Sequence, residues 1–297
     1  AVTEMYSRPK IGSLDPSFMM APWHFIFFGM MLSDAGYGLL LTILLFVVLK
    51  VLKPEGNAGK LVTVIFLGSI STIFWGAMFG GWFGLEFNPI LLSPMNEPLK
   101  MLALCFGLGA AHIILGVCMK MYLEIKRGQI WNAIFDQLSW LVIFAGLGLM
   151  AFMPDTQVGK YLALGGMTVI ILTGGRDKKN IFRRLLSGVL SLYNFSGYFS
   201  DLLSYSRLFA LGLSTGVIAM VINTIAHMLW QAGPVGIVIA IVFLLLGHTF
   251  NIAVNIMGAF VHTSRLQYIE FFGKFFEPGG RAFKPLAIRT KYVNVSK

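Results

Sequence analysis

Long apolar runs separated by short polar segments constrain the fold of this chain more than any other feature. The runs cover about 18–52, 61–84, 99–119, 135–153, 158–175, 200–230 and 235–272. A helix needs about 20 apolar residues to cross the ~30 Å hydrocarbon core of a bilayer. Only 12% of the 297 residues are charged, whereas a soluble domain carries about a quarter. The sequence therefore predicts an all-α integral membrane protein.

The first apolar run, 18–52, is too long for one ordinary crossing and short for two. Its middle reads Ser33-Asp34-Ala35-Gly36-Tyr37-Gly38, in which an acid and two glycines suit a tight turn. One tilted helix and a hairpin of two short helices both fit this pattern. In the hairpin, Asp34 would lie in the outer turn, and its simplest role is that of a helix cap.

The distribution of lysine and arginine favours the hairpin. If both termini are cytoplasmic, nearly all of the 23 basic residues fall in inner segments, and among the loops only Lys100 and Lys160 fall outside. Inner loops of membrane proteins carry this excess of positive charge. We therefore predict eight transmembrane helices, of which the first two form a short hairpin and the last two are long and tilted. The net charge of +10 reflects this topology and does not indicate nucleic-acid binding.

We expect three parts along the chain. Residues 1–17 would be a cytoplasmic linker from a missing N-terminal soluble domain, 18–276 the eight-helix membrane domain, and 277–297 a cytoplasmic tail. The chain opens Ala-Val-Thr without an initiator methionine or a visible signal peptide, so it reads as a piece of something longer. Residues 182–199 follow the most basic loop, and we expect them to form an amphipathic helix along the cytoplasmic face.

Two arginines, Arg207 and Arg265, lie inside apolar runs. A charged side chain at mid-membrane costs from about 3 to over 10 kcal/mol. Near a helix end, an arginine can avoid this cost by extending its head group to the interface. An arginine does not lose its proton in proteins. One that stays among apolar residues is therefore expected to face a wet path or an acidic partner.

The last apolar run carries polar residues at helical spacing. Three- and four-residue steps place the following set on one helix face: His248, Asn251, Asn255, Gly258, His262 and Arg265. A polar face must meet protein or water, although small polar groups packed between helices would give the same pattern. A weaker stripe on the preceding run comprises Ser200, Ser204, Arg207, Leu211 and Ser214. No proline intervenes between Pro234 and Pro278, which predicts one unusually long last helix.

Motifs for nucleotide hydrolysis and for metal-dependent or nucleophilic catalysis are missing from the sequence. The segment 56–60 only weakly resembles a Walker A loop, because Leu61 stands where Ser or Thr would bind Mg²⁺. Cys105 and Cys118 share one apolar run and predict ordinary packing. Gly76, Gly80 and Gly84 are four residues apart and predict a small-residue face for close helix packing. The chain alone is therefore not expected to hydrolyse ATP.

The motifs resemble the membrane domain of the a (or I) subunit of bacterial V/A-type rotary ATPases. The resemblance rests on Phe27-Phe28-Gly29-Met30-Met31-Leu32-Ser33-Asp34, on Ser204-Tyr205-Ser206-Arg207-Leu208-Phe209, and on Gly258-Ala259-Phe260-Val261-His262-Thr263-Ser264-Arg265. It implies a stator subunit that forms two ion half-channels against a rotating proteolipid ring. Such a subunit couples ATP hydrolysis elsewhere in the complex to H⁺ or Na⁺ translocation.

The resemblance also implies site residues and partners. Arg207 would be the essential arginine and Arg265 its companion. Further residues of the ion pathway would be Asp201, Ser204, Ser214, Thr215, His248, Asn251, Asn255, His262, Gln267 and Glu270. The partners would be the proteolipid c/K ring, the central-stalk and peripheral-stalk subunits, the ATP-hydrolysing A/B head and the lipid bilayer of a bacterial plasma membrane. No cofactor or resident metal is expected, only the transported ion.

The sequence departs from the proton-pumping eukaryotic members of that family at two positions. Those relatives commonly have a glutamate where Asn255 stands and a histidine where Thr215 stands. Neutral oxygen donors can serve hydrated Na⁺ as well as water-borne protons, so both ions stay open, with a slight preference for Na⁺. Two other functions compete with this interpretation: a secondary ion transporter, which predicts an internal repeat that we do not see, and a membrane scaffold without a transport role, in which both arginines would be replaceable.

Overall fold

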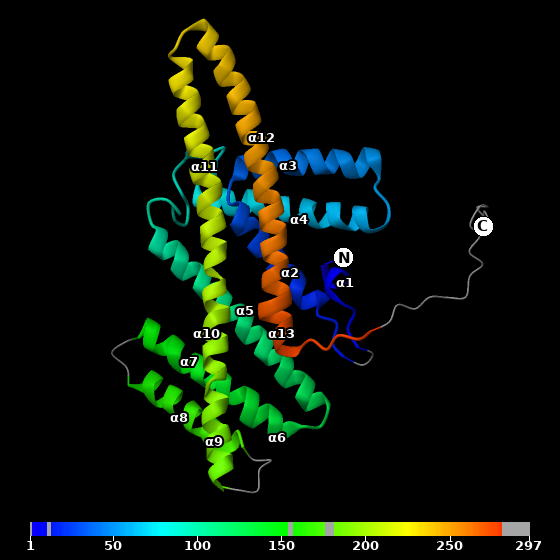
Figure 1. Cartoon of the computed structure of the whole chain (residues 1–297), viewed down its shortest axis with the longest axis vertical. Helices are drawn as coiled ribbons and strands as arrows, with labels where there is room; N and C mark the ends of the chain where they lie inside the picture. The colour runs from blue at the N-terminus through cyan, green and yellow to red at the C-terminus, as the bar shows by residue number, and fades with distance from the viewer. Residues whose placement is uncertain (1, 11–12, 154–156, 176–180, 281–297) are drawn as a thin grey trace, which may run out of the picture.

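The computed structural model describes residues 2–10, 13–153, 157–175 and 181–280. This part of the chain is helical apart from one two-residue strand pair and the connecting turns (Figure 1). Three segments, named η, have the wider π-helical hydrogen bonding. The elements are α1 (Val2–Tyr6), α2 (Ser17–Leu32), α3 (Ala35–Val47), η1 (Val48–Leu52), α4 (Gly56–Phe79), β1 (Gly81–Trp82), β2 (Leu85–Glu86), α5 (Pro98–Lys126), α6 (Ile130–Asn132), η2 (Ala133–Leu138), α7 (Ser139–Phe152), α8 (Val158–Thr173), α9 (Ile181–Leu192), α10 (Asn194–Ser204), α11 (Ser206–Trp230), α12 (Pro234–Arg265), η3 (Leu266–Phe271) and α13 (Phe272–Phe275).

Six helical stretches of the described chain are long and apolar enough to cross a membrane. They are Ala35–Leu52, Gly56–Phe79, Pro98–Lys126, Ile130–Met150, Leu186–Trp230 and Pro234–Phe275. The helices α2 and α8 are also apolar, but each has only 16 residues. The all-helical membrane fold is thus confirmed, whereas the count of eight crossings, which needs α2 and α8 to span as well, stays a prediction.

The break in the first apolar run falls where the sequence predicts it. Helix α2 ends at Leu32, Ser33 adopts a left-handed conformation with φ of 42°, and α3 begins at Ala35. Asp34 caps α3, because its carboxylate accepts a hydrogen bond from the backbone N–H of Tyr37 at 3.0 Å. The two helices do not pack along each other as a closed hairpin would. Each packs against α4 instead, and α3 turns away from α2 (Figure 1).

Glycines permit close helix contacts at some of the predicted positions and serve turns at others. A Cβ added to Gly76 of α4 would lie 2.1 Å from the backbone nitrogen of Ala35, so only glycine allows this approach. Helix α4 ends at Phe79, and Gly80 and Gly84 both have φ of 75°, a conformation that favours glycine. The predicted small-residue helix face is therefore right for Gly76 and wrong for the other two glycines, which turn the chain through the β1–β2 hairpin.

Helices α11 and α12 form the tallest hairpin of the structure (Figure 1). The last helix continues from α12 through η3 into α13 as one run of 42 residues, so the prediction of an unusually long last helix is confirmed. At ~1.5 Å per residue such a helix is about 63 Å long, roughly twice the thickness of the hydrocarbon core. Helix α9, expected to lie along the cytoplasmic face, packs against α8 and leads through α10 towards α11.

The core surrounds α2, which packs against α4, α11 and α12. Phe27, Phe28, Met30 and Met31 of α2 are all almost completely buried there, in one cluster with Leu208 of α11. The packed α2 fixes the beginning of α11 and the end of α12 relative to each other. These are the places where the two arginines lie.

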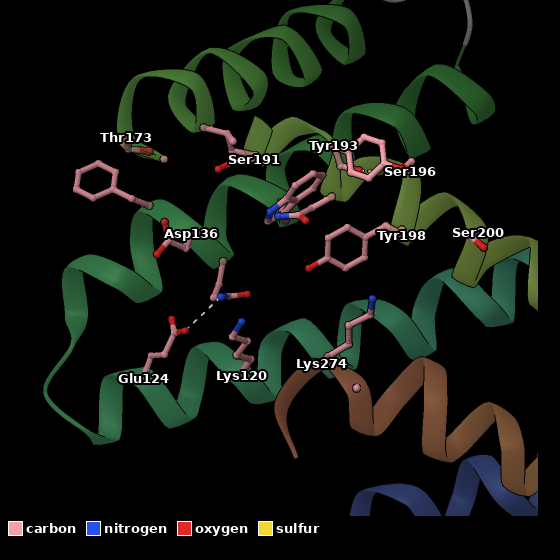
Figure 2. A pocket seen from close by; sticks show the side chains of 18 residues that line it. Lys120, Glu124, Asp136, Thr173, Ser191, Tyr193, Ser196, Tyr198, Ser200 and Lys274 are labelled. Atoms are coloured by element: carbon pink, nitrogen blue, oxygen red, sulfur yellow. Dashed lines mark hydrogen bonds between the residues drawn. The ribbon is translucent and has the colours of Figure 1, made fainter. Parts of the chain in front are cut away.

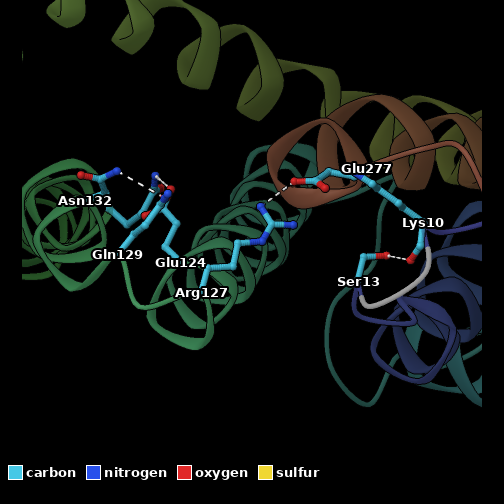
Figure 3. A network of polar contacts seen from close by, with 8 residues as sticks. Lys10, Ser13, Glu124, Arg127, Gln129, Asn132 and Glu277 are labelled. Carbon is cyan, nitrogen blue, oxygen red and sulfur yellow. Dashed lines mark hydrogen bonds and ion pairs between the residues drawn. The ribbon is translucent and has the colours of Figure 1, made fainter. Parts of the chain in front are cut away.

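The start of the chain packs against the end of the last helix. Pro9 and Pro278 form an isolated antiparallel bridge, and Arg127 donates a hydrogen bond of 2.7 Å to the carboxylate of Glu277 (Figure 3). This hydrogen bond is the main cause that lowers the pKa of the exposed Glu277 below its ordinary value. Most of the predicted C-terminal tail, 281–297, lies outside the described residues.

Candidate functional site

The two arginines lie on neighbouring helices and act on each other. Arg207 is in the first turn of α11 and Arg265 is the last residue of α12, and these two helices pack along each other. The two guanidinium groups are close enough to repel each other, and both act electrostatically on the ring of His262. The structure thus brings three of the predicted site residues into one positively charged cluster.

The backbone next to Arg207 is firmly anchored. Tyr205 lies at the junction of α10 and α11, is completely buried, and its hydroxyl is 2.8 Å from Nδ1 of His112 in α5. Leu208 is also completely buried. The guanidinium itself is only partly buried, yet its Nη1 is shielded from solvent and has no hydrogen-bond partner among the described residues. A guanidinium has five donors, so this side chain has capacity for an acceptor from outside the chain.

Glu270 is the acidic residue that the structure places beside Arg207. It lies in η3, is only 2% exposed, and its Oε2 has no hydrogen-bond partner among the described residues. Ser204 and Arg207 both act favourably on its carboxylate. Gln267, one turn earlier, is fully buried and lies near His112. Ser204, Arg207 and Glu270 therefore form one polar group at the start of α11 and the end of the last helix.

Asp201 has a partner that the sequence does not suggest. Its carboxylate forms an ion pair with Lys274 of α13, and both side chains are mostly buried, with 21% and 17% exposure. The Lys274 ammonium also lies 4.1 Å from the centre of the Tyr198 ring, a favourable cation–π arrangement. This ion pair joins α10 to the end of the last helix.

A second polar group lies between α3, α11 and α12. The Tyr37 hydroxyl is 2.6 Å from Nδ1 of His248, whose Nε2 is 3.0 Å from the side-chain oxygen of Asn223. Asn251 donates to the Tyr37 hydroxyl at 3.0 Å, and Asn255 donates to the side-chain oxygen of Asn251 at 2.6 Å. A carbonyl oxygen only accepts, so His248 donates through Nε2 and accepts from Tyr37 at Nδ1. From Asn255 through Asn251, Tyr37 and His248, each side chain therefore donates a hydrogen bond to the next, and Asn223 is the last acceptor.

Sequence reasoning missed Tyr37 and Asn223 in this group. Tyr37 was part of the predicted turn, and its distance of 211 residues from His248 along the chain gives no local signal. Asn223 lies outside the polar stripe of the run 200–230, and His227, one helical turn later, is its only polar neighbour at helical spacing. Only the packing of α3 against the α11–α12 hairpin reveals either residue.

The polar stripe of the last helix is not one uniform face. Asn251 and Asn255 are buried, whereas Arg265 is exposed. Thr215 is also completely buried and donates to the backbone oxygen of Leu211, as does Ser214, at 3.0 and 2.9 Å. The sequence also allowed that small polar groups are packed between helices. These buried side chains are packed in that way. No three His, Cys, Asp or Glu side chains are grouped as metal ligands in the described ranges.

The surface around the arginines is otherwise apolar. Large hydrophobic side chains of α10, α12 and η3 are exposed there, namely Leu203, Val254, Met257, Val261 and Ile269. Positive charge within an exposed apolar surface fits contact with a membrane-embedded partner that supplies an acidic group.

Comparisons with known proteins identify similar chains. Residues 196–288 match the model of the V-type ATPase 116kDa subunit family, the segment that holds both arginines. Subunit I of the A-type ATP synthase of Methanocaldococcus jannaschii is 34% identical over 98% of this chain and 47% of the relative. The corresponding subunit of Pyrococcus horikoshii is 36% identical over 97% of this chain and 45% of its own length.

A bacterial relative completes the comparison. Subunit I of the V-type ATP synthase of Borreliella burgdorferi is 30% identical over 89% of this chain and 47% of the relative. The chain spans about half the length of the curated relatives that it matches. Over nearly its whole length the chain is thus similar to subunit I of A-type and V-type ATP synthases, and its residues 196–288 match the V-type ATPase 116kDa subunit family.

Proposed function

We propose that this chain is the membrane half of a stator subunit that carries ions past a rotating proteolipid ring. The observation that carries the proposal is Arg207, a cation whose Nη1 is shielded from solvent and has no partner within the described chain. The apolar surface beside it would face the ring, and each ring subunit would present a carboxylate to the arginine. The sequence carries no Walker A motif for nucleotide hydrolysis, so hydrolysis would occur in the A/B head of the complex.

The chemistry of this encounter follows from charge. A carboxylate crosses lipid only in a neutral form, loaded with H⁺ or Na⁺, because a bare charge is costly there. When the loaded carboxylate reaches Arg207, the fixed positive charge favours its ionised form, so the ion is released. The bare carboxylate then passes the arginine and reloads from the other side. The same positive charge repels cations and so blocks a direct leak between the two half-channels.

The proposal includes a topology and a set of partners. We propose eight crossings with both termini in the cytoplasm of a bacterium, α2 and α8 being the two short ones. The central-stalk and peripheral-stalk subunits would hold the chain in the complex, the latter through a soluble half that lies outside this sequence. The relatives are named as subunits of ATP synthases, which supports assembly into such a complex.

The two alternatives predict different behaviour. A secondary transporter would have broken helices close to its midplane site, whereas the last helix continues through 42 residues. A scaffold would tolerate the loss of both arginines. The mutual repulsion of Arg207 and Arg265 supports a functional role, because two like charges kept near each other in an apolar region are costly.

We expect Arg265→Ala to have a milder effect than loss of Arg207. Arg265 is exposed, and its removal relieves repulsion of Arg207, so the complex should still move ions but with fewer ions per ATP or with lower stability. The ratio of ion uptake to ATP hydrolysis in proteoliposomes measures this coupling. Complete loss of transport by a fully assembled Arg265→Ala complex would contradict the expectation that Arg265 is less important for transport than Arg207.

The first test of the function is ATP-driven uptake of radioactive Na⁺ into proteoliposomes that contain the whole complex, with a protonophore present. We expect uptake to persist, because neutral side chains stand at the positions of the usual glutamate and histidine. Absence of Na⁺ uptake together with ATP-driven acidification, measured without the protonophore, would identify a proton pump and contradict the choice of ion. Absence of both would contradict the proposed function.

A further inference from the structure

A large cavity lies where the ends of several helices meet. Its volume is about 790 Å³, and side chains from α5, η2, α8, α9, α10 and α13 line it (Figure 2). The lining includes the hydroxyl and amide groups of Gln137, Thr173, Ser191, Asn194, Ser196 and Ser200, together with the charged side chains of Lys120, Glu124, Asp136 and Lys274. One water takes about 30 Å³ in the liquid, so a polar cavity of this size has room for many waters.

The cavity belongs to the cytoplasmic side of the proposed topology. Lys120 and Glu124 line it from the last turns of α5, just before the basic pair Lys126 and Arg127. Gly174, at the end of α8, precedes the most basic loop of the chain. Basic segments of this kind mark the cytoplasmic ends of helices. The cavity therefore opens on the side from which cytoplasmic ions arrive.

The ion pair between Asp201 and Lys274 forms the inner limit of this cavity. Lys274, Tyr198 and Ser200 line it, whereas Asp201, the next residue after Ser200, does not. Figure 2 shows the Lys274 side chain extending between the α5 ribbon and Tyr198. The Asp201 carboxylate and the Tyr198 ring both hold the Lys274 ammonium. The ammonium thus occupies a place, beside a carboxylate and a ring face, that suits a cation.

The polar group around Arg207 lies directly beyond this ion pair. Glu270 is one helical turn from Lys274, and Asp201 is close enough to act on the Glu270 carboxylate. Ser204, one turn after Asp201, and Arg207 act on that carboxylate as well. The order from the cavity inwards is therefore Lys274 and Asp201, then Ser204 and Glu270, then the arginine. A cation that moves from the cavity to Arg207 has to pass the Lys274 ammonium, which repels it.

We propose that the Asp201–Lys274 ion pair is a gate between the cavity and the Glu270–Arg207 group, closed in this structure. The inference rests on the proposed transport function. When the ion pair separates, Asp201 becomes available to a cation from the cavity, and the path to Glu270 opens. With the ion pair intact, the tethered ammonium of Lys274 occupies the Asp201 carboxylate and excludes the mobile cation.

Thiol labelling of the assembled complex in membrane vesicles with the cytoplasmic face outwards tests the gate. The background carries Cys105→Ala and Cys118→Ala, and the probe is a membrane-impermeant, trimethylammonium-bearing methanethiosulfonate. Ser200→Cys reports on the cavity, and Ser204→Cys reports on the space beyond the ion pair. We expect Lys274→Ala to raise the labelling rate of Ser204→Cys roughly tenfold or more, because a nearby positive charge no longer repels the probe. The rate at Ser200→Cys should change much less.

Two controls separate the gate from a general loosening of the fold. Lys120→Ala removes a lysine that lines the same cavity but is not ion-paired with Asp201, and it should leave labelling of Ser204→Cys unchanged. The exchange Asp201→Lys with Lys274→Asp should return labelling towards the slow rate, which simple damage to packing would not do. Equal labelling of Ser204→Cys with and without Lys274→Ala would overturn the gate. Loss of transport in Arg207→Ala would still support the proposed function in that case, so the two proposals fail separately.

Discussion

Replacing Arg207 with alanine is expected to abolish ATP-driven ion transport by the assembled complex while leaving the subunit in place. The substitution removes the side chain beyond Cβ, and the packing around this position depends on Tyr205 and Leu208, both completely buried. Nη1 has no partner within the described chain, so few internal contacts are lost. A carboxylate that reaches the site would no longer meet a fixed positive charge, so it would keep its ion and pass without release. The variant complex should therefore assemble normally but fail to transport ions.

The measurement compares ion uptake in proteoliposomes with the amount of intact complex on a native gel. Arg127→Ala is a matched control, because Arg127 forms an exposed ion pair with Glu277 and such surface pairs contribute little to stability. Arg207→Lys keeps the charge but loses the planar group with five donors, so we expect severely reduced transport as well. Transport at a near-normal rate in Arg207→Ala would sink the proposed role of this arginine.

The apolar runs were sufficient to predict the membrane fold, because a helix buried in lipid has to be apolar over a long stretch of sequence. The sharp turn at Ser33 and Asp34 was predictable for a local reason, since the residues that make it are adjacent. The predicted hairpin differs from the structure in one respect: α2 and α3 do not pack along each other, because the direction in which α3 leaves the turn depends on its packing against α4. Tertiary packing of this kind leaves no periodic signal in the sequence of either helix.

The candidate site shows the same division between local and distant information. Arg207 and Arg265 stand out because charge is rare in apolar runs, and the structure brings them together. Spacing alone treated Asn251 and Arg265 as one face, yet the first is buried and the second is exposed. The packing of α11 and α2 against the last helix changes along its length. The same stripe is therefore covered by protein in one part of the helix and lies at the surface in another. The partner of Asp201 is 73 residues away, beyond the reach of any local pattern.

The second large effect is expected from Asp34→Ala, which should lower the stability of the chain. The Asp34 carboxylate is 1% exposed and accepts three backbone hydrogen bonds, each of 3.0 Å, from Tyr37, Phe83 and Gly84. Alanine leaves three donors unpaired, one at a buried and two at part-buried positions, and a fully buried donor without an acceptor costs about 1–3 kcal/mol. The total loss should be on the order of 3 kcal/mol or more, which corresponds to a decrease of roughly 5–10 °C in the midpoint of thermal unfolding.

The measurement is the midpoint of heat-induced unfolding of the purified chain in detergent. Asp15→Ala is the matched control, because Asp15 also accepts a backbone hydrogen bond, from Ser17 at 2.9 Å, but at an exposed site. Its effect should be small, since water replaces the lost acceptor there. Asp34→Asn should lie between the two, because its single carbonyl oxygen can still serve Tyr37 and Phe83, while its amide group meets the N–H of Gly84.

The consequence of Asp34→Ala should extend to the second polar group. The backbone oxygen of Phe83 accepts a hydrogen bond of 2.7 Å from Asn223, and Asn223 in turn accepts from His248. If Asp34 no longer holds the backbone of Phe83, the hydrogen bonds that join α3, α11 and α12 lose their fixed end. Transport per assembled complex should then decrease together with stability. An Asp34→Ala chain that is as stable as Asp15→Ala would show that the three hydrogen bonds do not hold the turn.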